Sequence, residues 1–199
     1  MILTILAYVV IGLYTLALAY ITFYCLMQFQ LLIKYGKGRK QKTPDDEGMN
    51  SWGPVFPMVT IQLPIFNERF VVERLIDNMV GMNYPADRLQ IQVLDDSTDD
   101  TKEVCSRKVE EYRQKGVNIV HIHRENRNGY KAGALRDGLA TATGEFIAIF
   151  DADFLPHHDF LLKTLPYLKD KKVGVVQTRW DHINGEYSLI TRLQAFQLN

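Results

Sequence analysis

The sequence has few cysteines and no net charge, and both features exclude classes of protein. Of its 199 residues only two are cysteines, Cys25 and Cys105, which lie far apart and form no metal-binding or redox pattern. Lysine and arginine together number 23, as do aspartate and glutamate, so the formal net charge is zero and we expect no nucleic-acid partner. The sequence also contains no G-x-G-x-x-G string and no P-loop, so nothing supports a dinucleotide-binding or NTPase interpretation.

Charged residues are absent from a long stretch at the amino terminus. Residues 2–33 contain none, and as a helix they would extend roughly 48 Å, against about 30 Å of bilayer hydrocarbon. We therefore predict a transmembrane helix over residues 1–33, which tilts in the lipid bilayer or extends beyond its core. A cleaved signal peptide fits less well, because the run is too long, no basic segment precedes it and no A-x-A-like site follows.

A basic segment without periodicity follows this helix. We interpret residues 34–57 as a juxtamembrane linker, since they are rich in glycine, proline, lysine and acidic residues. Its first basic residues indicate that this end of the helix faces the cytoplasm; they are Lys34, Lys37, Arg39, Lys40 and Lys42. We predict a location in the cell membrane, or in the Golgi membrane of a eukaryote, with the downstream domain cytoplasmic. The basic cluster could also contact anionic lipid, although a topology signal alone is the simpler interpretation.

From residue 58 onward, strand-like segments alternate with helical patterns. The candidate strands are residues 58–63, 89–94, 117–122 and 145–150, and the candidate helices follow residue 68 to about 82 and cover 99–115 and 131–142. The first helix is predicted from apolar residues at helical spacing, namely Phe70, Val71, Leu75, Ile76, Met79 and Val80. This alternation predicts an α/β domain with a mostly parallel sheet over residues 58–199.

Two carboxylates, Asp151 and Asp153, follow the last predicted strand. The carboxyl ends of strands in an open α/β sheet are where ligands bind. On an extended segment, the i, i+2 spacing would put both side chains on one face. Two close carboxylates repel each other unless a cation lies between them. We therefore predict a hard divalent ion here, Mg²⁺ or Mn²⁺, which would also hold substrate phosphates.

Polar residues also follow the first two predicted strands. The first ends in Pro-Ile-Phe-Asn-Glu at residues 64–68 and the second in Asp95 and Asp96. Asn67 could cap the next helix or face a ligand, and the sequence alone favours capping. Asp99 or Thr98 would cap the helix that follows the second strand.

The third strand leads into a glycine-rich turn with a lysine. In Gly-Tyr-Lys-Ala-Gly, at residues 129–133, the helix-opening amides and Lys131 would suit a phosphate. Alternatively, Gly129 is only a left-handed turn residue and Lys131 a solvated helix start. The sequence holds four further polar candidates, and we expect them at the surface, with either of the last two able to lie near the metal: His121, His123, His157 and His158.

Taken together, four ordered motifs resemble family 2 glycosyltransferases. They occupy residues 64–68, 94–99, 126–135 and 150–154, and weaker similarity continues at 175–180 and 189–194. The strongest resemblance is to the processive, membrane-bound branch, which includes cellulose synthase and the cellulose-synthase-like A group of glucomannan mannosyltransferases. The string Asn-Arg-Asn-Gly-Tyr-Lys-Ala-Gly-Ala-Leu at residues 126–135 resembles that group. The resemblance implies a GT-A fold.

The resemblance also implies a role for individual residues. Asp96 would bind the nucleotide base, Lys131 the diphosphate, and Asp153 the metal, with Asp151 near the ribose and the metal. The implied nucleotide-sugar site comprises Pro64, Asn67, Glu68, Asp95, Asp96, Gly129, Lys131 and Asp151. A divalent cation and a lysine suit this role because the leaving diphosphate develops negative charge.

The implied activity is the transfer of a hexose, with inversion, from UDP-glucose or GDP-mannose to a growing β-linked polysaccharide. A polyprenyl-phosphate sugar synthase and a non-catalytic nucleotide-sugar-binding module remain alternatives. The family's general base is expected beyond Asn199, and its Gln-x-x-Arg-Trp motif is missing, since residues 177–180 are one residue too short. We therefore expect the amino-terminal part of a longer enzyme, able to bind a nucleotide sugar with a divalent cation but not to make polymer.

Overall fold

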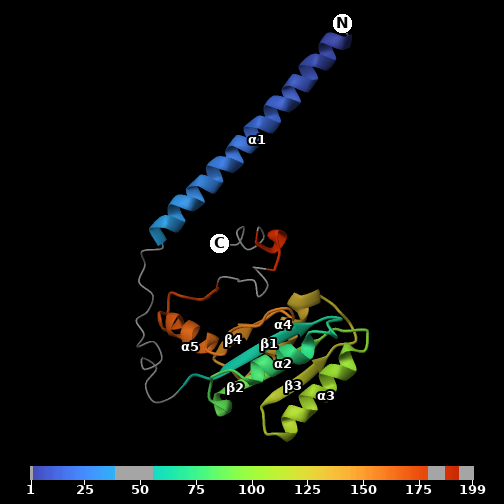
Figure 1. Ribbon diagram of the computed structural model, residues 1–199, viewed down its shortest axis with the longest axis vertical. Coiled ribbons are helices and arrows are strands. Elements are labelled where there is room, and N and C mark those ends of the chain that lie inside the picture. The colour runs from blue at the N-terminus through green and yellow to red at the C-terminus, as the bar shows by residue number, and fades with distance from the viewer. Residues whose placement is uncertain (1, 39–55, 179–186, 193–199) are drawn as a thin grey trace. The chain divides into compact units, whose positions relative to one another are not determined.

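The computed structural model describes residues 2–38, 56–178 and 187–192, with side chains of the first helix described to Lys34. The chain divides into two compact units, residues 1–45 and 46–199. In the first, α1 runs from Ile2 to Gly38 (Figure 1), five residues past the predicted end, and its described side chains are exposed. The stretch Ile2–Lys34 is long and apolar enough to cross a membrane. The helix agrees with the predicted transmembrane segment in length and composition.

The second unit contains a four-stranded parallel sheet in the order β3-β2-β1-β4. Its strands are β1 (Val59–Ile65), β2 (Leu89–Asp95), β3 (Ile119–His123) and β4 (Phe146–Ile149). All four carboxyl ends therefore meet at one edge of the sheet. The predicted α/β class with a parallel sheet is confirmed.

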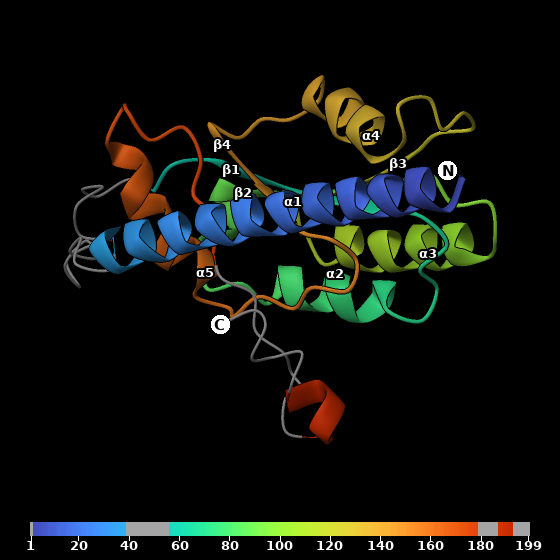
Figure 2. The ribbon, with the colours of Figure 1, turned by 90° about the horizontal axis from the view of Figure 1, so that it is seen from above.

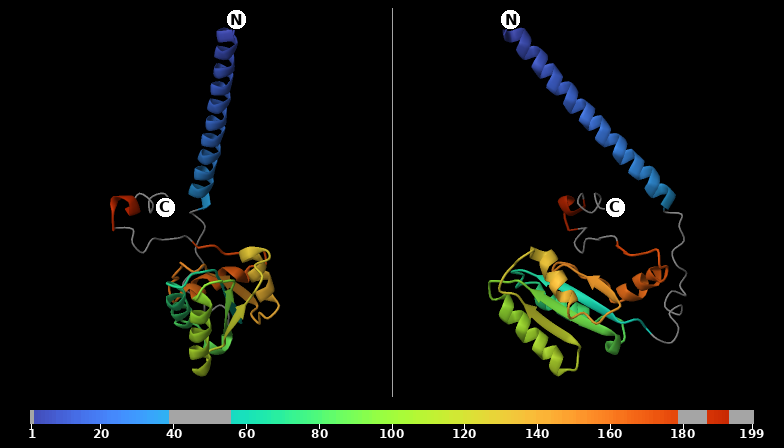
Figure 3. Two further views of the ribbon diagram at one scale, coloured as in Figure 1. Left: turned by 90° about the vertical axis from the view of Figure 1, so that its right-hand side faces the viewer. Right: turned by 180° about the vertical axis from the view of Figure 1, so that it is seen from behind.

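Helices cover both faces of this sheet. Figure 2 shows α4 (Tyr130–Leu139) on the opposite side from α2 (Val72–Val80) and α3 (Thr101–Gln114). Figure 3 shows the same three layers from two further sides. The second unit also contains a short helix α5 (Phe160–Thr164) and two 3₁₀ helices, η2 (Ala86–Arg88) and η3 (Leu165–Lys169).

The apolar core lies between the sheet and the α2/α3 layer. Alternate residues of the central strands point into it because side chains in a strand alternate between faces. Burying a large aliphatic side chain of this kind contributes about 1.5–3 kcal/mol. The fully buried members include Val59, Ile61 and Leu63 from β1, Ile91 and Val93 from β2, and Val72, Leu75, Ile76 and Met79 from α2.

The opposite face of the central strands is buried but polar. Gln62 Nε2 donates to Gln92 Oε1 at 3.0 Å and to the Leu135 carbonyl of α4 at 3.3 Å. Gln92 in turn donates to Thr141 Oγ1 at 3.1 Å. An added Cβ at Gly138 would lie 2.7 Å from Gln62 Nε2, so this close approach requires glycine. Helix α4 thus packs on amide side chains as well as on the apolar Leu94.

Several predicted boundaries are wrong by a few residues. The first helix begins only at Val72, because the Glu68 carbonyl accepts the amides of Val71 and Val72 in a turn that precedes it. Phe70, one of the apolar residues from which the helix was predicted, therefore lies before it and is 93% exposed. The first and third strands start and end later than predicted, α4 ends at Leu139 rather than at residue 142, and β4 is shorter than 145–150.

Candidate functional site

The ends of β1 and β2 are joined through Asn67. The backbone N–H of Asn67 donates to Ser97 Oγ at 2.9 Å. Its side-chain Oδ1 accepts from the backbone N–H of Thr98 at 2.9 Å. Asn67 adopts a left-handed backbone with φ of 56°, which asparagine tolerates better than most residues. Asn67 does not cap α2, whose N-cap residue is Val71, so the capping prediction is wrong. Instead it ties two strand ends together and remains exposed.

Asp95 lies behind the surface of this edge. Its carboxylate is completely buried and accepts from the Ser97 amide at 2.8 Å, His121 Nε2 at 2.9 Å and His123 Nδ1 at 3.3 Å. Burial alone would raise the pKa of Asp95, but the hydrogen bonds from His121 and Ser97 outweigh it and lower the pKa to about 2. The structure therefore does not bring Asp95 to the surface with the other predicted site residues.

The two histidines beside Asp95 are partly buried, which corrects the prediction of surface histidines. Strand pairing explains their position, because β3 lies next to β2 with Asp95 opposite His123. Ligand atoms of Asp95, Cys105 and His121 lie within 4.8 Å of one another. Burial raises the pKa of the Cys105 thiol to about 12, so it stays protonated. We interpret Asp95 and its two histidine partners as a hydrogen-bonded network that fixes the end of β2.

Asp96 is also buried, but on the other side, where it meets an arginine that sequence reasoning missed. Arg124 binds it through two parallel contacts, Nε to Oδ1 at 2.7 Å and a terminal nitrogen to Oδ2 at 2.6 Å. The hydrogen bond to Asp96 raises the pKa of Arg124 further above its usual value. The only sequence signal for this arginine was its position directly after the third strand.

The segment before α4 has an unusual backbone. Gly129 and Tyr130 are both left-handed, with φ of 74° and 49°. Gly129 therefore is the predicted left-handed turn residue, and a helix does open after it. An added Cβ at Gly133 would lie 2.0 Å from the Asn128 carbonyl, so the loop presses directly on the helix. The Arg127 guanidinium lies over the Phe66 ring, 3.3 Å from its centroid, which joins this loop to the end of β1.

The first turn of α4 contacts the segment that follows β4 through an ion pair. Lys131 Nζ is paired with Asp151 Oδ1, and the two side chains are 51% and 40% exposed. Asp153 is exposed, and no described residue pairs with its carboxylate. The Phe154 amide donates to the Asp151 carbonyl in a turn, so the premise of an extended segment through both aspartates is wrong. Even so, both residues follow β4, at the edge of the sheet where the carboxyl ends of the strands lie.

The remaining predicted residues occupy less specific positions. Pro64 is partly buried within β1, and Glu68 is exposed while its carbonyl forms the turn before α2. His158 lies beside Gly81 at the end of α2, where a Cβ on that glycine would be 3.2 Å from its ring. Of the short Gln-Thr-Arg-Trp string, residues 179–180 lie outside the described residues.

This arrangement suits a phosphate-bearing ligand with a cation. Lys131 pairs with Asp151, and the exposed Asp153 lies two residues further on, at the edge where open α/β sheets bind ligands. Carboxylate oxygens are the donors that Mg²⁺ and Mn²⁺ prefer, so Asp151 and Asp153 fit such an ion. The ammonium of Lys131 already lies beside one of them and is half exposed, so it can reach a phosphate.

Two curated proteins that are similar to this chain are plant glucomannan mannosyltransferases. The chain is 48% identical over 149 residues to glucomannan 4-beta-mannosyltransferase 1 of Cyamopsis tetragonoloba and 47% identical to glucomannan 4-beta-mannosyltransferase 9 of Arabidopsis thaliana. Each match covers 72% of this chain and 28% of the relative, so the chain spans less than a third of their length.

A solved structure shares the fold. The mannosyltransferase PcManGT of Pyrobaculum calidifontis, in complex with GDP-Man and Mn²⁺, is 32% identical with a TM-score of 0.61 and is matched over 75% of this chain and 43% of its own. The family model described as glycosyl transferase family 2 matches residues 60–198, which include all four strand ends. The fold, the strand-end residues and these matches agree, and the chain belongs to glycosyl transferase family 2.

Proposed function

We propose that this chain is the donor-binding part of a membrane-bound inverting hexosyltransferase that extends a β-linked polysaccharide. The observation that carries the proposal is the pairing of Lys131 with Asp151 beside the exposed Asp153. A sugar diphosphate needs such groups. The lysine ammonium can bind its phosphates, and the carboxylates can bind a divalent metal ion that also contacts the phosphates.

The residues of the chain divide the donor between them. Lys131 would bind the diphosphate and stabilise the negative charge that the leaving group develops. Asp153, with Asp151, would hold Mg²⁺ or Mn²⁺, which when bound supplies further positive charge to the same phosphates. The exposed Asn67 and Glu68 would line the base and ribose, and the turn at Gly129 would face the phosphates. Asp96, held by Arg124, would bind the base.

The donor we favour is GDP-mannose rather than UDP-glucose. The curated relatives are named as glucomannan mannosyltransferases, and PcManGT was solved with GDP-Man and Mn²⁺. The same names favour a polysaccharide acceptor over a polyprenyl phosphate. These are properties of the relatives, and their transfer to this chain is part of the proposal.

The membrane assignment completes the proposal. We infer that α1 crosses the lipid bilayer and that Lys34 begins the cytoplasmic side, because basic residues follow the apolar helix. A reporter at the carboxyl terminus tests the orientation. Activity of a reporter that works only in an exterior compartment would contradict it.

The function is tested by binding and incorporation measured on the same preparation. GDP-mannose and UDP-glucose are each titrated calorimetrically into the detergent-solubilised chain, with and without Mn²⁺, and labelled sugar is followed into insoluble product. We expect Mn²⁺-dependent binding of one donor and no polymer. Absence of binding to either donor would refute the donor-site assignment, whereas polymer synthesis would show that a base lies within residues 1–199.

A further inference from the structure

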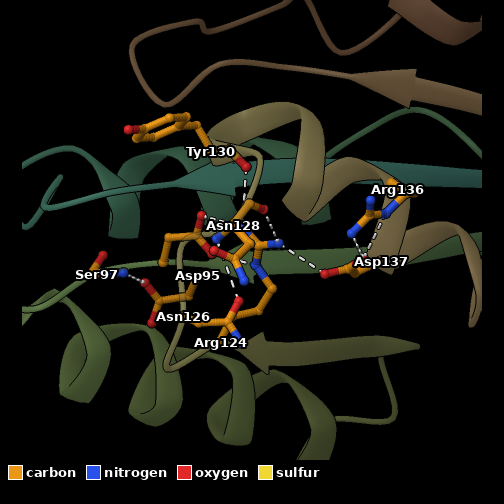
Figure 4. A network of polar contacts seen from close by, with 9 residues as sticks. Asp95, Ser97, Arg124, Asn126, Asn128, Tyr130, Arg136 and Asp137 are labelled. Atoms are coloured by element: carbon orange, nitrogen blue, oxygen red, sulfur yellow. Dashed lines mark hydrogen bonds and ion pairs between the residues drawn. The ribbon is translucent and has the colours of Figure 1, made fainter.

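We propose that Arg124 is the positioning residue of the donor site: it holds the loop of residues 126–130 in the conformation that places Lys131 at the diphosphate. The inference rests on the proposed function, since it assigns Lys131 the phosphate. Figure 4 shows Arg124 surrounded by the groups it contacts, with Asn128, Tyr130 and Asp137 around its guanidinium.

Every donor of this guanidinium is used. Arginine has five N–H groups in a fixed planar arrangement, and Arg124 makes five hydrogen bonds. Two go to the carboxylate of Asp96, and one goes to Asp137 Oδ2 of α4 at 2.9 Å. The other two go to loop carbonyls, Asn128 at 3.3 Å and Tyr130 at 3.1 Å. One side chain thus joins the end of β2, the loop and α4.

The loop needs such support. Tyr130 has a left-handed backbone although it is not glycine, a strained conformation that persists only where surrounding contacts over-determine it. Arg124 bonds the carbonyl of that residue and the one two positions before it. Lys131 is the next residue along the chain. The direction in which its side chain leaves the helix is therefore set by the backbone that Arg124 fixes.

Burial makes the arrangement specific for arginine. The Arg124 side chain is 10% exposed and that of Asp96 is 3% exposed, so unpaired groups there have little access to water. Lysine keeps the charge but has three donors on a single nitrogen, so it cannot bond two carboxylates and two carbonyls in one plane. A charge-conserving substitution should therefore release the loop.

The test compares Arg124→Lys with Arg136→Lys. Arg136 binds the same Asp137 at 3.0 Å but its side chain is 73% exposed, and among the described residues it has no bond to the loop. GDP and UDP are each titrated with MnCl₂ into the detergent-solubilised chain. We expect Arg124→Lys to weaken binding of the preferred nucleotide on the order of tenfold, and Arg136→Lys to leave it unchanged.

A double mutant separates positioning from general destabilisation. If Arg124 acts through Lys131, adding Arg124→Lys to Lys131→Gln causes little further loss of affinity, because the two effects are coupled. Equal losses in both backgrounds would overturn the inference. So would unchanged affinity of Arg124→Lys for a nucleotide that the wild-type chain binds.

Amide hydrogen exchange supplies a readout that needs no ligand. Exchange of the peptide covering residues 126–133 should rise in Arg124→Lys and not in Arg136→Lys, and unchanged exchange would overturn the inference. If the wild-type chain binds neither nucleotide, the proposed function fails while this readout still decides the positioning role. If Arg124→Lys does not fold, Asp137→Ala removes one of the five acceptors and is expected to give the same rise, smaller in size.

Discussion

Two aspartates near the ends of strands of one sheet differ in almost every physical respect. Asp95 at the end of β2 is fully buried and accepts hydrogen bonds from a backbone amide and two histidines. Asp151 after β4 is 40% exposed and has one lysine as its partner. A carboxylate whose hydrogen bonds are all satisfied internally stabilises the fold, whereas an open one is available to a ligand. This edge of the sheet thus has a structural half, around the buried Asp95, and a chemical half, around the partly exposed Asp151.

The strongest test of the chemical half is Asp153→Asn. We expect the cation dependence of nucleotide-diphosphate binding to disappear, because an amide is a much poorer ligand for a hard divalent cation than a carboxylate. Titration of GDP with and without Mn²⁺ measures this, and Asp170→Asn, at another exposed aspartate, is the control. A variant that keeps the full Mn²⁺ effect would show that Asp153 is not a metal ligand.

Lys131→Gln should weaken nucleotide-diphosphate binding by about 1.5–3 kcal/mol, the usual contribution of a charge-assisted contact. The effect should fall on the diphosphate, so guanosine binding is the matched comparison. Equal losses for GDP and guanosine would point instead to a damaged fold, and thermal unfolding of the variant distinguishes the two.

Asp95→Asn should act on stability rather than on phosphate chemistry. We expect the free energy of unfolding at pH 7 to fall by about 2 kcal/mol, and Asp151→Asn to leave it nearly unchanged. Urea unfolding of both variants measures the difference. Comparable losses in the two would remove the distinction between the halves of the edge.

The lowered pKa of Asp95 predicts that the free energy of unfolding depends on pH. Its pKa is lowered in the folded state to about 2 from an ordinary 3.8, so between these values the unfolded chain binds more protons than the folded one. The stability that Asp95 contributes is present above pH 3.8 and is lost as the pH falls toward 2. Unfolding of Asp95→Asn should therefore depend less steeply on pH in that window.

The smallest effect is expected for an exposed ion pair away from the sheet edge. Glu73 of α2 pairs with Arg107 of α3, but their side chains are 49% and 69% exposed. Glu73→Gln should change the free energy of unfolding by about 0.2–1 kcal/mol, because water and salt screen such pairs. A loss as large as that of Asp95→Asn would mean that exposure does not separate structural from dispensable carboxylates in this protein.

Local sequence patterns were sufficient to find the four strands and their order along the chain, but not their exact bounds. Residues 89–94 and 145–150 show apolar runs bounded by turn residues, and the topological rule for parallel sheets places the residues after each strand at one edge. The prediction of Lys131 and Asp151 at that edge depended only on these local features and on family motifs. Their pairing is a consequence of the strand order.

The features that could not be predicted depend on contacts between strands. The burial of Asp95 and its two histidine partners results from the pairing of β2 with β3, which no local pattern encodes. Arg124 stood in a polar segment and had no motif of its own. The glutamines of β1 and β2 alternate with apolar residues, a pattern typical of a strand with one face exposed to solvent. In the structure α4 covers that face.

The buried glutamines beneath α4 fix the position of this helix along the sheet. Apolar contacts have no preferred direction, so a helix on an apolar surface can shift along it with little loss of binding free energy. Hydrogen bonds have a narrow range of distance and angle, and a shift by one residue, about 1.5 Å, would break the bond from Gln62 to the Leu135 carbonyl. Lys131 lies one helical turn before that carbonyl. The hydrogen bond from Gln62 therefore determines how far Lys131 lies from the end of the sheet.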